Sequence, residues 1–432
     1  MMNYQESIHY LEEEIGFASC PGLERIIDLM EALGNPEKTL KVIHIAGTNG
    51  KGSAAALLSS ILQAAGLRTA TYTSPHLETY NERFLMNGQE ISDEAFANIM
   101  TRTKEACSQL VAQGKDAPTL FEVITGAAFL YFAEQNVDIA IIEVGLGGKY
   151  DATNIIENPI LSIIMSISMD HTDFLGNTIE QIAAEKAGII KKSCPVVLYS
   201  QDELVYNIVK SSANTLEAPL YCPNDAKINI SSQSLDGTVF DVKSTSFAYD
   251  GLFLPLLGQH QIQNCVTILE ACEVLKGNGY PLTEQQIRTG ISKAFWAGRM
   301  EIFKKSPMIV LDGAHNADGI RRLAENVSIY FKNYSITLVL GVLGDKEYEK
   351  MAELILPLAD QVVFTEPHSE RKLDAETLAN ITHHKELPFY IEPMLEKAYQ
   401  TALNITEENG MILCCGSLYM IGALRSYILS VE

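Results

Sequence analysis

The sequence of 432 residues lacks the marks of several protein classes. It has no apolar run long enough to cross a bilayer, and its first residues, MMNYQESIHYLEEEIGF, show no basic region followed by an apolar stretch. We therefore expect neither a membrane span nor a secretory signal. No C-x-x-C motif occurs among the eight cysteines, so neither a disulfide framework nor a cysteine metal site is expected. These absences predict a cytoplasmic protein.

Positive charge is also scarce, since 32 Lys and Arg stand against 54 Asp and Glu and the formal net charge is −22. Non-specific nucleic-acid binding requires a basic surface, so this composition argues against it. Small anions are not excluded, because backbone N–H groups, a few cations and a metal can focus positive potential at one place.

Strand-like and helical patterns alternate along most of the chain. Apolar runs at 137–148 and 159–171 lack polar alternation and predict strands covered on both faces. Residues 225–257 alternate around an Asp-Gly pair and predict a small antiparallel excursion. A second alternating series begins near 300, and the length exceeds that of one typical core.

We therefore predict an α/β fold with two domains. The first, at 1–296, has a mostly parallel sheet and the small antiparallel excursion. The second, at 297–432, is Rossmann-like, and the hinge is expected at 295–303.

The stretch KVIHIAGTNGKGSAAALLSSILQAAG, 41–66, predicts a strand at 42–46, a phosphate-binding loop and a helix at 53–65. Its spelling departs from G-x-x-x-x-G-K-[ST], because Ile45 occupies the first glycine position and Gly52 separates Lys51 from Ser53. Small residues let backbone N–H groups converge, the helix adds positive potential, and the lysine reaches phosphates. The alternative is a glycine-rich turn with a solvated lysine. The predicted cradle comprises Gly47, Thr48, Asn49, Gly50, Lys51, Gly52 and Ser53.

Three polar residues follow apolar strands and are candidates for binding Mg²⁺ near such a cradle: Ser74, Glu143 and His171. Ser74 and His171 are equally typical of caps or satisfied polar groups. Glu143 is more informative, because an unpaired buried carboxylate is costly and therefore requires a cation.

Further candidates lie later in the chain. Lys186 is on a predicted helix, where an exposed lysine is the plain alternative. Asp312 and His315 end another strand; the first is suited to a ribose hydroxyl or a metal-bound water, the second to a phosphate or a structural turn. Arg299 at the hinge would reach a triphosphate from outside the first domain, or be a linker charge.

Taken together and in order, the motifs resemble those of folylpolyglutamate synthases, ATP-dependent ligases related to the Mur ligases. The motifs are HIAGTNGKGS, TSPHLETYNERF, IIEVGLGG, DATN, MDHTDFLGNTIEQIAAEKAGIIK, GQHQIQN, GRME, DGAHN and GSLY. The resemblance spans nearly the whole chain, and it implies a P-loop-type ATPase domain at 1–296 and a Rossmann-like ligase domain at 297–432. In this family the phosphate loop is itself written GTNGKGS, so the unusual spelling is the family's own.

The resemblance implies a role for each candidate. Lys51 and the loop amides would hold ATP phosphates, and Ser74, Glu143 and His171 would hold two Mg²⁺ ions. Lys186 matches a lysine that the family carbamylates. The remaining implied positions are Asn264, Arg299 and Asp312 for ATP, His315 and Ser417 near glutamate and phosphate, Arg83 for a substrate carboxylate, and Asp151 and Asn154 beside the pterin. The family's common arginine after GLGG is Lys149 here, which removes a bidentate contact.

The implied reaction adds L-glutamate to the γ-carboxylate of a folate through an acyl phosphate. Catalysis would involve Lys51, His171, Lys186 and His315 in a monomer. Dihydrofolate synthase, which uses dihydropteroate, is an alternative or additional activity, and GLERI at 22–26 resembles bifunctional members. A Mur-type ligase for a UDP-sugar is disfavoured, because the phosphate loop begins by residue 47. A nucleotide-dependent switch without ligase activity remains the alternative from another class.

Overall fold

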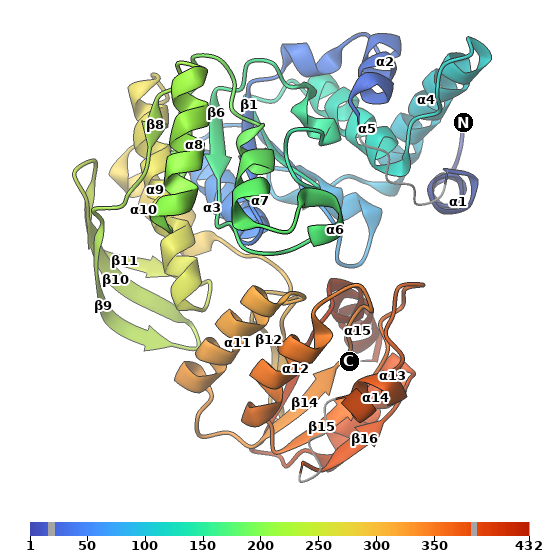
Figure 1. The fold of residues 1–432 in the computed structure, drawn as a ribbon, viewed down its shortest axis with the longest axis vertical. Coiled ribbons are helices and arrows are strands. Elements are labelled where there is room, and N and C mark those ends of the chain that lie inside the picture. The colour runs from blue at the N-terminus through green and yellow to red at the C-terminus, as the bar shows by residue number, and fades with distance from the viewer. Residues whose placement is uncertain (16–21, 382–386, 432) are drawn as a thin grey trace.

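The computed structural model describes residues 1–15, 22–381 and 387–431, and it consists of two α/β units, each built around its own sheet (Figure 1). The N-terminal unit has an eight-stranded sheet in the order β4-β3-β2-β5-β1-β6-β7-β8. Strands β2, β5, β1, β6, β7 and β8 run parallel, whereas β3 and β4 form an antiparallel extension at one edge. The bounds are β1 Val42–Ala46, β2 Thr69–Tyr72, β3 Phe84–Met86, β4 Gln89–Glu90, β5 Ile139–Glu143, β6 Leu161–Ile164, β7 Val196–Leu198 and β8 Leu220–Tyr221.

Helices cover both faces of this sheet. Ile43 and Ile45 of β1 pack in the same cluster as residues of α3 and α9, while Val42 and Ala46 point to the opposite face. The helices are α1 Tyr4–His9, α2 Glu24–Ala32, α3 Lys51–Ala64, α4 Asp93–Ala112, α5 Leu120–Glu134, α6 Thr172–Leu175, α7 Ile179–Ala187, α8 Glu203–Thr215, α9 Gln259–Gly277 and α10 Glu284–Lys293, with a π-helix η1 Tyr10–Ile15 and short 3₁₀ turns η2 Pro36–Thr39, η3 Tyr80–Arg83 and η4 Ala152–Ile155. Within the described ranges, no helix is both long and apolar enough to span a bilayer.

The C-terminal unit has a six-stranded sheet in the order β12-β13-β17-β14-β15-β16, parallel except for the edge strand β12. Its elements are β12 Glu301–Lys305, β13 Met308–Leu311, α11 Ala317–Tyr330, β14 Ile336–Leu340, α12 Tyr348–Ile355, η5 Leu356–Leu358, β15 Gln361–Phe364, α13 Ala375–Ile381, β16 Phe389–Ile391, α14 Leu395–Ile405, β17 Met411–Cys415 and α15 Leu418–Val431. The predicted antiparallel excursion is confirmed as the three-stranded sheet of β9 Lys227–Ser234, β10 Gly237–Lys243 and β11 Ala248–Leu254.

One detail of the predicted fold is wrong. The strand expected over 159–171 ends at Ile164, because the following backbone turns to pair with the phosphate loop: Thr48 N–H donates to the Ser166 carbonyl at 2.8 Å. In the segment 295–303, where the hinge is expected, β12 begins at Glu301 and pairs with β13; the hinge stays a prediction.

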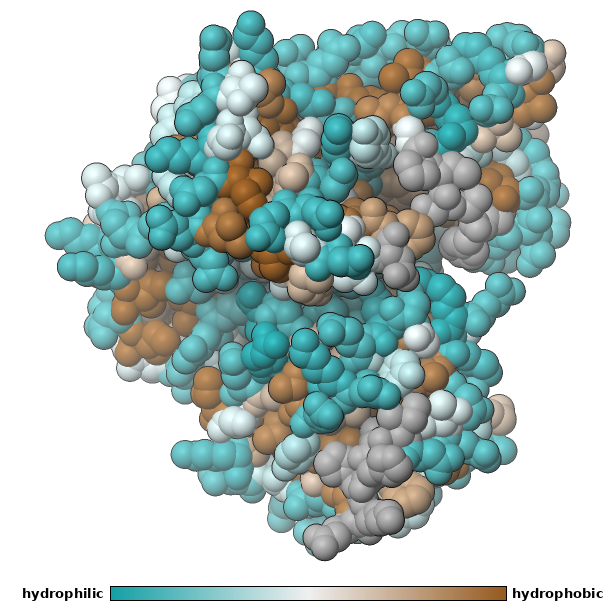
Figure 2. Space-filling view, viewed as in Figure 1, coloured by the Kyte–Doolittle hydropathy of each residue, from teal (hydrophilic) through white to brown (hydrophobic). Residues whose placement is uncertain are grey.

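One close contact between the two units is made by the loop after β2 and the helix α15. Leu77, in the loop after β2, packs against the apolar cluster beneath α15, and a Cβ added to Gly422 would lie 1.7 Å from the Leu77 carbonyl oxygen. Arg425 of α15 forms ion pairs with Glu78 of the same loop and, at 3.1 Å, with Glu301. The small sheet makes a second contact, where the Gln233 amide donates to the Tyr330 hydroxyl of α11 at 3.4 Å. Hydrophilic residues predominate where the two units meet on the face seen in Figure 2.

Candidate active site

The predicted phosphate loop connects β1 to α3, and its glycines are sterically required. Gly50 precedes α3 with φ +88°, and a Cβ there would lie 2.7 Å from Asn264 Oδ1. A Cβ on Gly52 would lie 2.7 Å from the Trp296 indole nitrogen. The helix begins at Lys51, two residues earlier than expected, so the first-turn N–H groups open toward the loop. Backbone and helix therefore form a ready anion site.

Lys51 and Glu143 share this site. Lys51 Nζ lies 3.8 Å from Glu143 Oε1 and 3.3 Å from the Thr48 carbonyl oxygen. Burial raises the pKa of Glu143 to about 7, although the Lys51 charge and a backbone hydrogen bond from Ser74 oppose the shift. The Ser74 hydroxyl is buried and makes no hydrogen bond among the described residues. Two hard oxygen donors, one of them without a partner, thus face the cleft beside a lysine.

Lys186 is not an exposed lysine on a helix surface, which was the alternative to a functional role. It is buried near the end of α7, and its Nζ donates to the Gly47 carbonyl at 2.9 Å. Burial and then the Lys51 charge lower the pKa of Lys186 to about 7. The amine is therefore substantially neutral at physiological pH.

The second unit contributes Arg299, Asp312 and His315 to the same cleft. Asp312 accepts hydrogen bonds from the backbone N–H of Met300 at 2.9 Å and of Ala314 at 2.8 Å. Burial raises its pKa, and the Arg299 charge opposes this. His315 Nδ1 lies 2.8 Å from the Gly313 carbonyl oxygen, so Nδ1 carries the proton and Nε2 is the acceptor. Burial lowers the pKa of His315 to about 4, which keeps the ring neutral.

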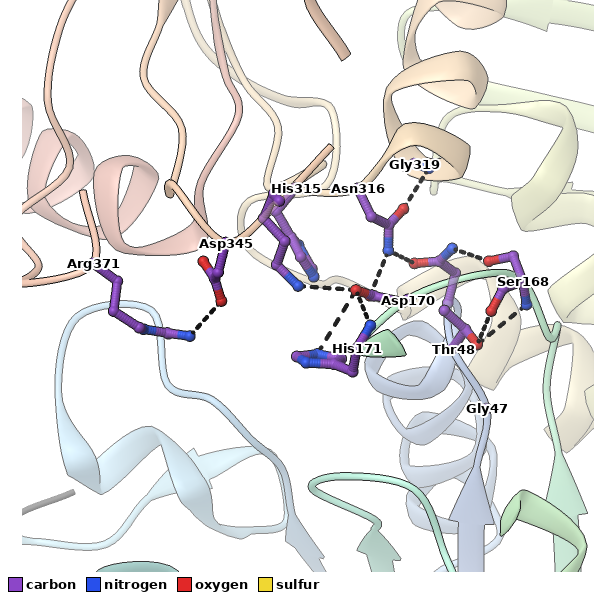
Figure 3. Close-up of polar contacts among 12 residues, drawn as sticks. Gly47, Thr48, Ser168, Asp170, His171, His315, Asn316, Gly319, Asp345 and Arg371 are labelled. Atoms are coloured by element: carbon purple, nitrogen blue, oxygen red, sulfur yellow. Dashed lines mark hydrogen bonds and ion pairs between the residues drawn. The ribbon is translucent and has the colours of Figure 1, made fainter. Parts of the chain in front are cut away.

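Asp170 was not among the predicted residues, yet it lies at the centre of the contacts between the units (Figure 3). Its carboxylate accepts from Lys346 Nζ at 2.9 Å, from the Asn316 amide at 2.8 Å and from the His171 backbone N–H at 2.9 Å. Burial alone would raise the pKa of Asp170, but the charges of His171 and Lys346 hold it below its ordinary value. Asp170 is the acidic residue of the motif MDH, so the sequence offered it as a candidate. Its partner Lys346 lies 176 residues away, and no sequence pattern relates the two.

The phosphate loop itself also touches the second unit. The Asn49 amide donates to Asp318 Oδ2 at 3.0 Å, and the Asn316 amide donates to Asn49 Oδ1 at 3.3 Å. Both partners belong to the start of α11. Any ligand that moves the loop would therefore act directly on the contact between the units.

On α9, Gln261 connects the loop to Asn264. Its amide donates to the Ser53 hydroxyl at 3.1 Å, and its carbonyl oxygen accepts from the Asn264 amide at 3.0 Å. The Asn264 carbonyl oxygen has no partner among the described residues, so it remains available to a ligand donor. Gln261 was not among the predicted residues, although it stands in the motif GQHQIQN three residues before Asn264.

One cleft brings together most of the sequence-predicted residues. They are Gly47, Thr48, Asn49, Gly50, Lys51, Gly52, Ser53, Ser74, Glu143, His171, Lys186, Asn264, Arg299, Asp312 and His315. Within the described parts of the chain, no group of three or more His, Cys, Asp and Glu is arranged to hold a metal ion.

Four predicted residues do not line this cleft: Arg83, Asp151, Asn154 and Ser417. Arg83 donates through Nε to His76 Nδ1 at 2.9 Å, and Asp151 accepts from the Leu146 backbone N–H at 2.8 Å. The Asn154 amide donates to the carbonyls of Lys149 and Gly188 at 2.9 and 3.1 Å. Ser417 has a buried hydroxyl without a hydrogen bond in the described ranges. Their substrate roles stay predictions.

Comparisons with known proteins find relatives of both units. Residues 45–272 match the Mur ligase middle domain, and residues 298–418 match the Mur ligase, glutamate ligase domain. The chain is 37% identical to the dihydrofolate synthase/folylpolyglutamate synthase of Bacillus subtilis, with 98% of each chain covered. Mycobacterium tuberculosis folylpolyglutamate synthase complexed with ADP has a TM-score of 0.91 at 31% identity, covering 98% of each chain.

Escherichia coli FolC in complex with DHPP and ADP is also similar, with a TM-score of 0.88, 28% identity, and coverage of 99% of this chain and 98% of that one. Sequence motifs, paired domain matches and near-complete structural overlap lead to one assignment. The chain belongs to the folylpolyglutamate synthase/dihydrofolate synthase family of the Mur ligase superfamily.

Proposed function

We propose that the chain is an ATP-dependent ligase that joins L-glutamate to the γ-carboxylate of a reduced folate through an acyl phosphate. The observation that carries this proposal is that the phosphate loop of one unit faces Arg299, Asp312 and His315 of the other across a single cleft. Dihydrofolate synthase is a second candidate activity, because the Bacillus subtilis relative carries both names. We further propose a monomer, divided into domains at 296/297.

ATP would bind with its phosphates on the loop amides and Lys51. Both similar complexes described above contain ADP. Arg299 and Asp312 would hold the nucleotide from the second unit, and the free Asn264 oxygen would accept a hydrogen bond from it. In this arrangement Lys51 offsets negative charge as the γ-phosphoryl group moves to the folate carboxylate.

Magnesium fits the residues present. The unpartnered Ser74 hydroxyl and the buried Glu143 carboxylate are hard oxygen donors, and the pKa of His171, lowered by burial to about 4, leaves its ring neutral and able to coordinate. When bound, two such ions would neutralise phosphate charge. Glu143 would be held ionised, since a cation replaces the solvent that burial removes.

The glutamate would enter from the second unit, where the neutral Nε2 of His315 and the buried Ser417 hydroxyl at the start of α15 offer a polar site for its amine and carboxylate. The amine then attacks the acyl phosphate and phosphate leaves. Arg83 would face a folate carboxylate, and Asp151 and Asn154 would line the pterin side. Closure of the units would exclude water from the acyl phosphate.

Phosphate release with ATP and Mg²⁺ tests the proposal. We expect release only when glutamate and an acceptor are both present, and tetrahydrofolate compared with dihydropteroate identifies the branch. Turnover independent of both substrates would instead support a nucleotide-dependent switch.

Arg299→Ala is expected to raise the KM for ATP about tenfold and leave the KM for folate within about twofold, because it removes a bidentate cation on the nucleotide side of the cleft. Lys305→Ala, which removes an exposed cation from the adjoining strand β12, is the matched control. Steady-state kinetics with each substrate varied in turn measure the effect. Equal losses for both substrates would indicate a general defect of the connecting segment.

Lys186 is expected to form a carbamate with CO₂. The amine nitrogen attacks the CO₂ carbon, a C–N bond forms and a proton leaves, so only the neutral amine reacts. With a pKa lowered to about 7, the amine becomes available as pH rises through that value, well below the pH at which an ordinary lysine would react. ¹³C NMR with ¹³CO₂ should show the carbamate in the wild type and lose it in Lys186→Arg; an unchanged signal in the variant would contradict the assignment.

A further inference from the structure

His44 is a buried polar residue that the proposed mechanism does not use. It lies in the middle of β1, between β5 and β6, and its side chain is fully buried. Its neighbours on the same face, Val42 and Ala46, belong to two separate apolar clusters. Burial lowers its pKa to about 3, so the imidazole is neutral. An apolar side chain at this position would avoid the cost of burying the ring.

The contacts of His44 define which nitrogen carries the proton. The Thr153 hydroxyl donates to Asp151 Oδ1 at 2.5 Å, which uses its single proton. His44 Nε2, 2.8 Å from the Thr153 oxygen, is therefore the donor in that contact. Nδ1 then holds a lone pair that meets no donor in the described ranges. The ring thus makes one directed hydrogen bond and leaves its other nitrogen unsatisfied, which does not serve stability.

That hydrogen bond leads to the wall of the cleft. Asp151, which accepts from Thr153, also accepts from the Leu146 backbone N–H at 2.8 Å. Leu146 and its flanking glycines, at 145 and 147, line the cleft. Hydrogen bonds therefore connect His44 to Thr153, Thr153 to Asp151 and Asp151 to Leu146. They link the central strand to the loop 145–151.

The other side of this loop rests on α7. The Lys149 backbone N–H donates to the Glu185 carbonyl at 2.9 Å, and a Cβ on Gly148 would lie 2.6 Å from the same oxygen. The loop has no room to shift toward α7. On its other side it is held by the Asn154 amide, which donates to the Lys149 carbonyl at 2.9 Å, and by Asp151 with its partner Thr153. The phosphate loop packs on different neighbours, including Met165, Asn264 and Trp296.

We propose that His44 is a positioning residue that fixes the loop 145–151 through Thr153 and so sets the affinity for the folate-type acceptor. This inference rests on the proposed function, in which Asp151 borders the pterin. Asp151 lies outside the cleft that holds the phosphate loop, and that loop has further supports of its own, so we expect a larger effect on the acceptor than on ATP.

The test is a comparison of His44→Leu, His44→Gln and His44→Asn. Leucine removes the donor, and we expect the acceptor KM to rise about tenfold while the ATP KM stays within about twofold. Glutamine places an amide near the position of Nε2 and should restore most of the affinity. Asparagine places its amide near Nδ1, too short to reach Thr153, and should resemble leucine. Thermal unfolding checks that each variant is folded.

Thr153→Val is a second test, because it removes the hydrogen bond between His44 and Thr153 by deleting the hydroxyl of Thr153. It should raise the acceptor KM to a similar extent, and the double variant with His44→Leu should be no worse than either single one. If His44→Leu does not fold, the comparison of His44→Gln with His44→Asn decides the question, because only glutamine can reach Thr153. Unchanged acceptor KM, or an equal rise for ATP, would overturn the inference. A wild-type protein without acceptor-dependent phosphate release would overturn the proposed function instead.

Discussion

Lys51→Ala is expected to reduce glutamate- and acceptor-dependent phosphate release by at least about 10³-fold, because the phosphoryl group would transfer without its nearest fixed cation. The substitution also removes the main charge that opposes the rise in the pKa of Glu143. Protonation of that carboxyl would weaken the proposed metal site at neutral pH. Both effects act in the same direction, which makes this the largest loss we expect from a single side chain.

The fold should survive the change. Lys51 occupies the first turn of α3, where alanine is a good helix former. Lys192→Ala, which removes an exposed lysine from the same unit, is the matched control and should retain full activity. Circular dichroism and phosphate release on both variants give the answer. A folded Lys51→Ala variant with most of its activity would disprove the phosphate role.

Gly422→Ala is expected to reduce kcat/KM by about 100-fold or more, because misplacement of reacting groups by about 1 Å can have that effect. The added Cβ would lie 1.7 Å from the Leu77 carbonyl oxygen, so the loop after β2 and α15 must separate. The same loop contains Ser74, and Arg425 of α15 binds its Glu78. Separation would therefore disturb both a proposed metal ligand and the contact between the units.

Gly277→Ala is the control for this substitution. Gly277 is the last residue of α9 and has nothing within 4 Å of an added Cβ, so alanine should leave both the fold and the activity unchanged. The two variants make the same chemical change in a helix and differ in available space. Small-angle scattering should detect the altered arrangement of the units in Gly422→Ala. Wild-type kinetics and scattering for that variant would show that the close approach is dispensable.

Much of the fold was predictable because strand and helix patterns are local. The strands leading to Lys51, Glu143 and Asp312 were located within a few residues. The ends of β1 and β5 share the edge of one sheet where ligands bind, and β13 ends at the corresponding edge of the second sheet. The helix α4 was missed although Ser92 precedes it and caps it by accepting from the Ala95 N–H. That signal was local and available.

The rest of the site depends on contacts between distant segments. Asp170 meets Lys346, and Asn49 meets Asp318, across the two units. No spacing in the sequence relates such pairs, and each residue alone is typical of a solvated surface. The end of β6 at Ile164 was likewise set by the phosphate loop, whose backbone takes the hydrogen bonds that a neighbouring strand would otherwise make.

The packing of Leu77 against α15 has a consequence for chimeras built from two members of this family. The apolar core of the C-terminal unit also takes in Leu257 and Leu235, which precede it in the chain. A chimera that joins the first half of this protein to the second half of another family member would therefore combine a loop and a helix shaped for different partners. Parents matched at Leu77 and Gly422 should yield active hybrids more often than parents matched for overall identity alone.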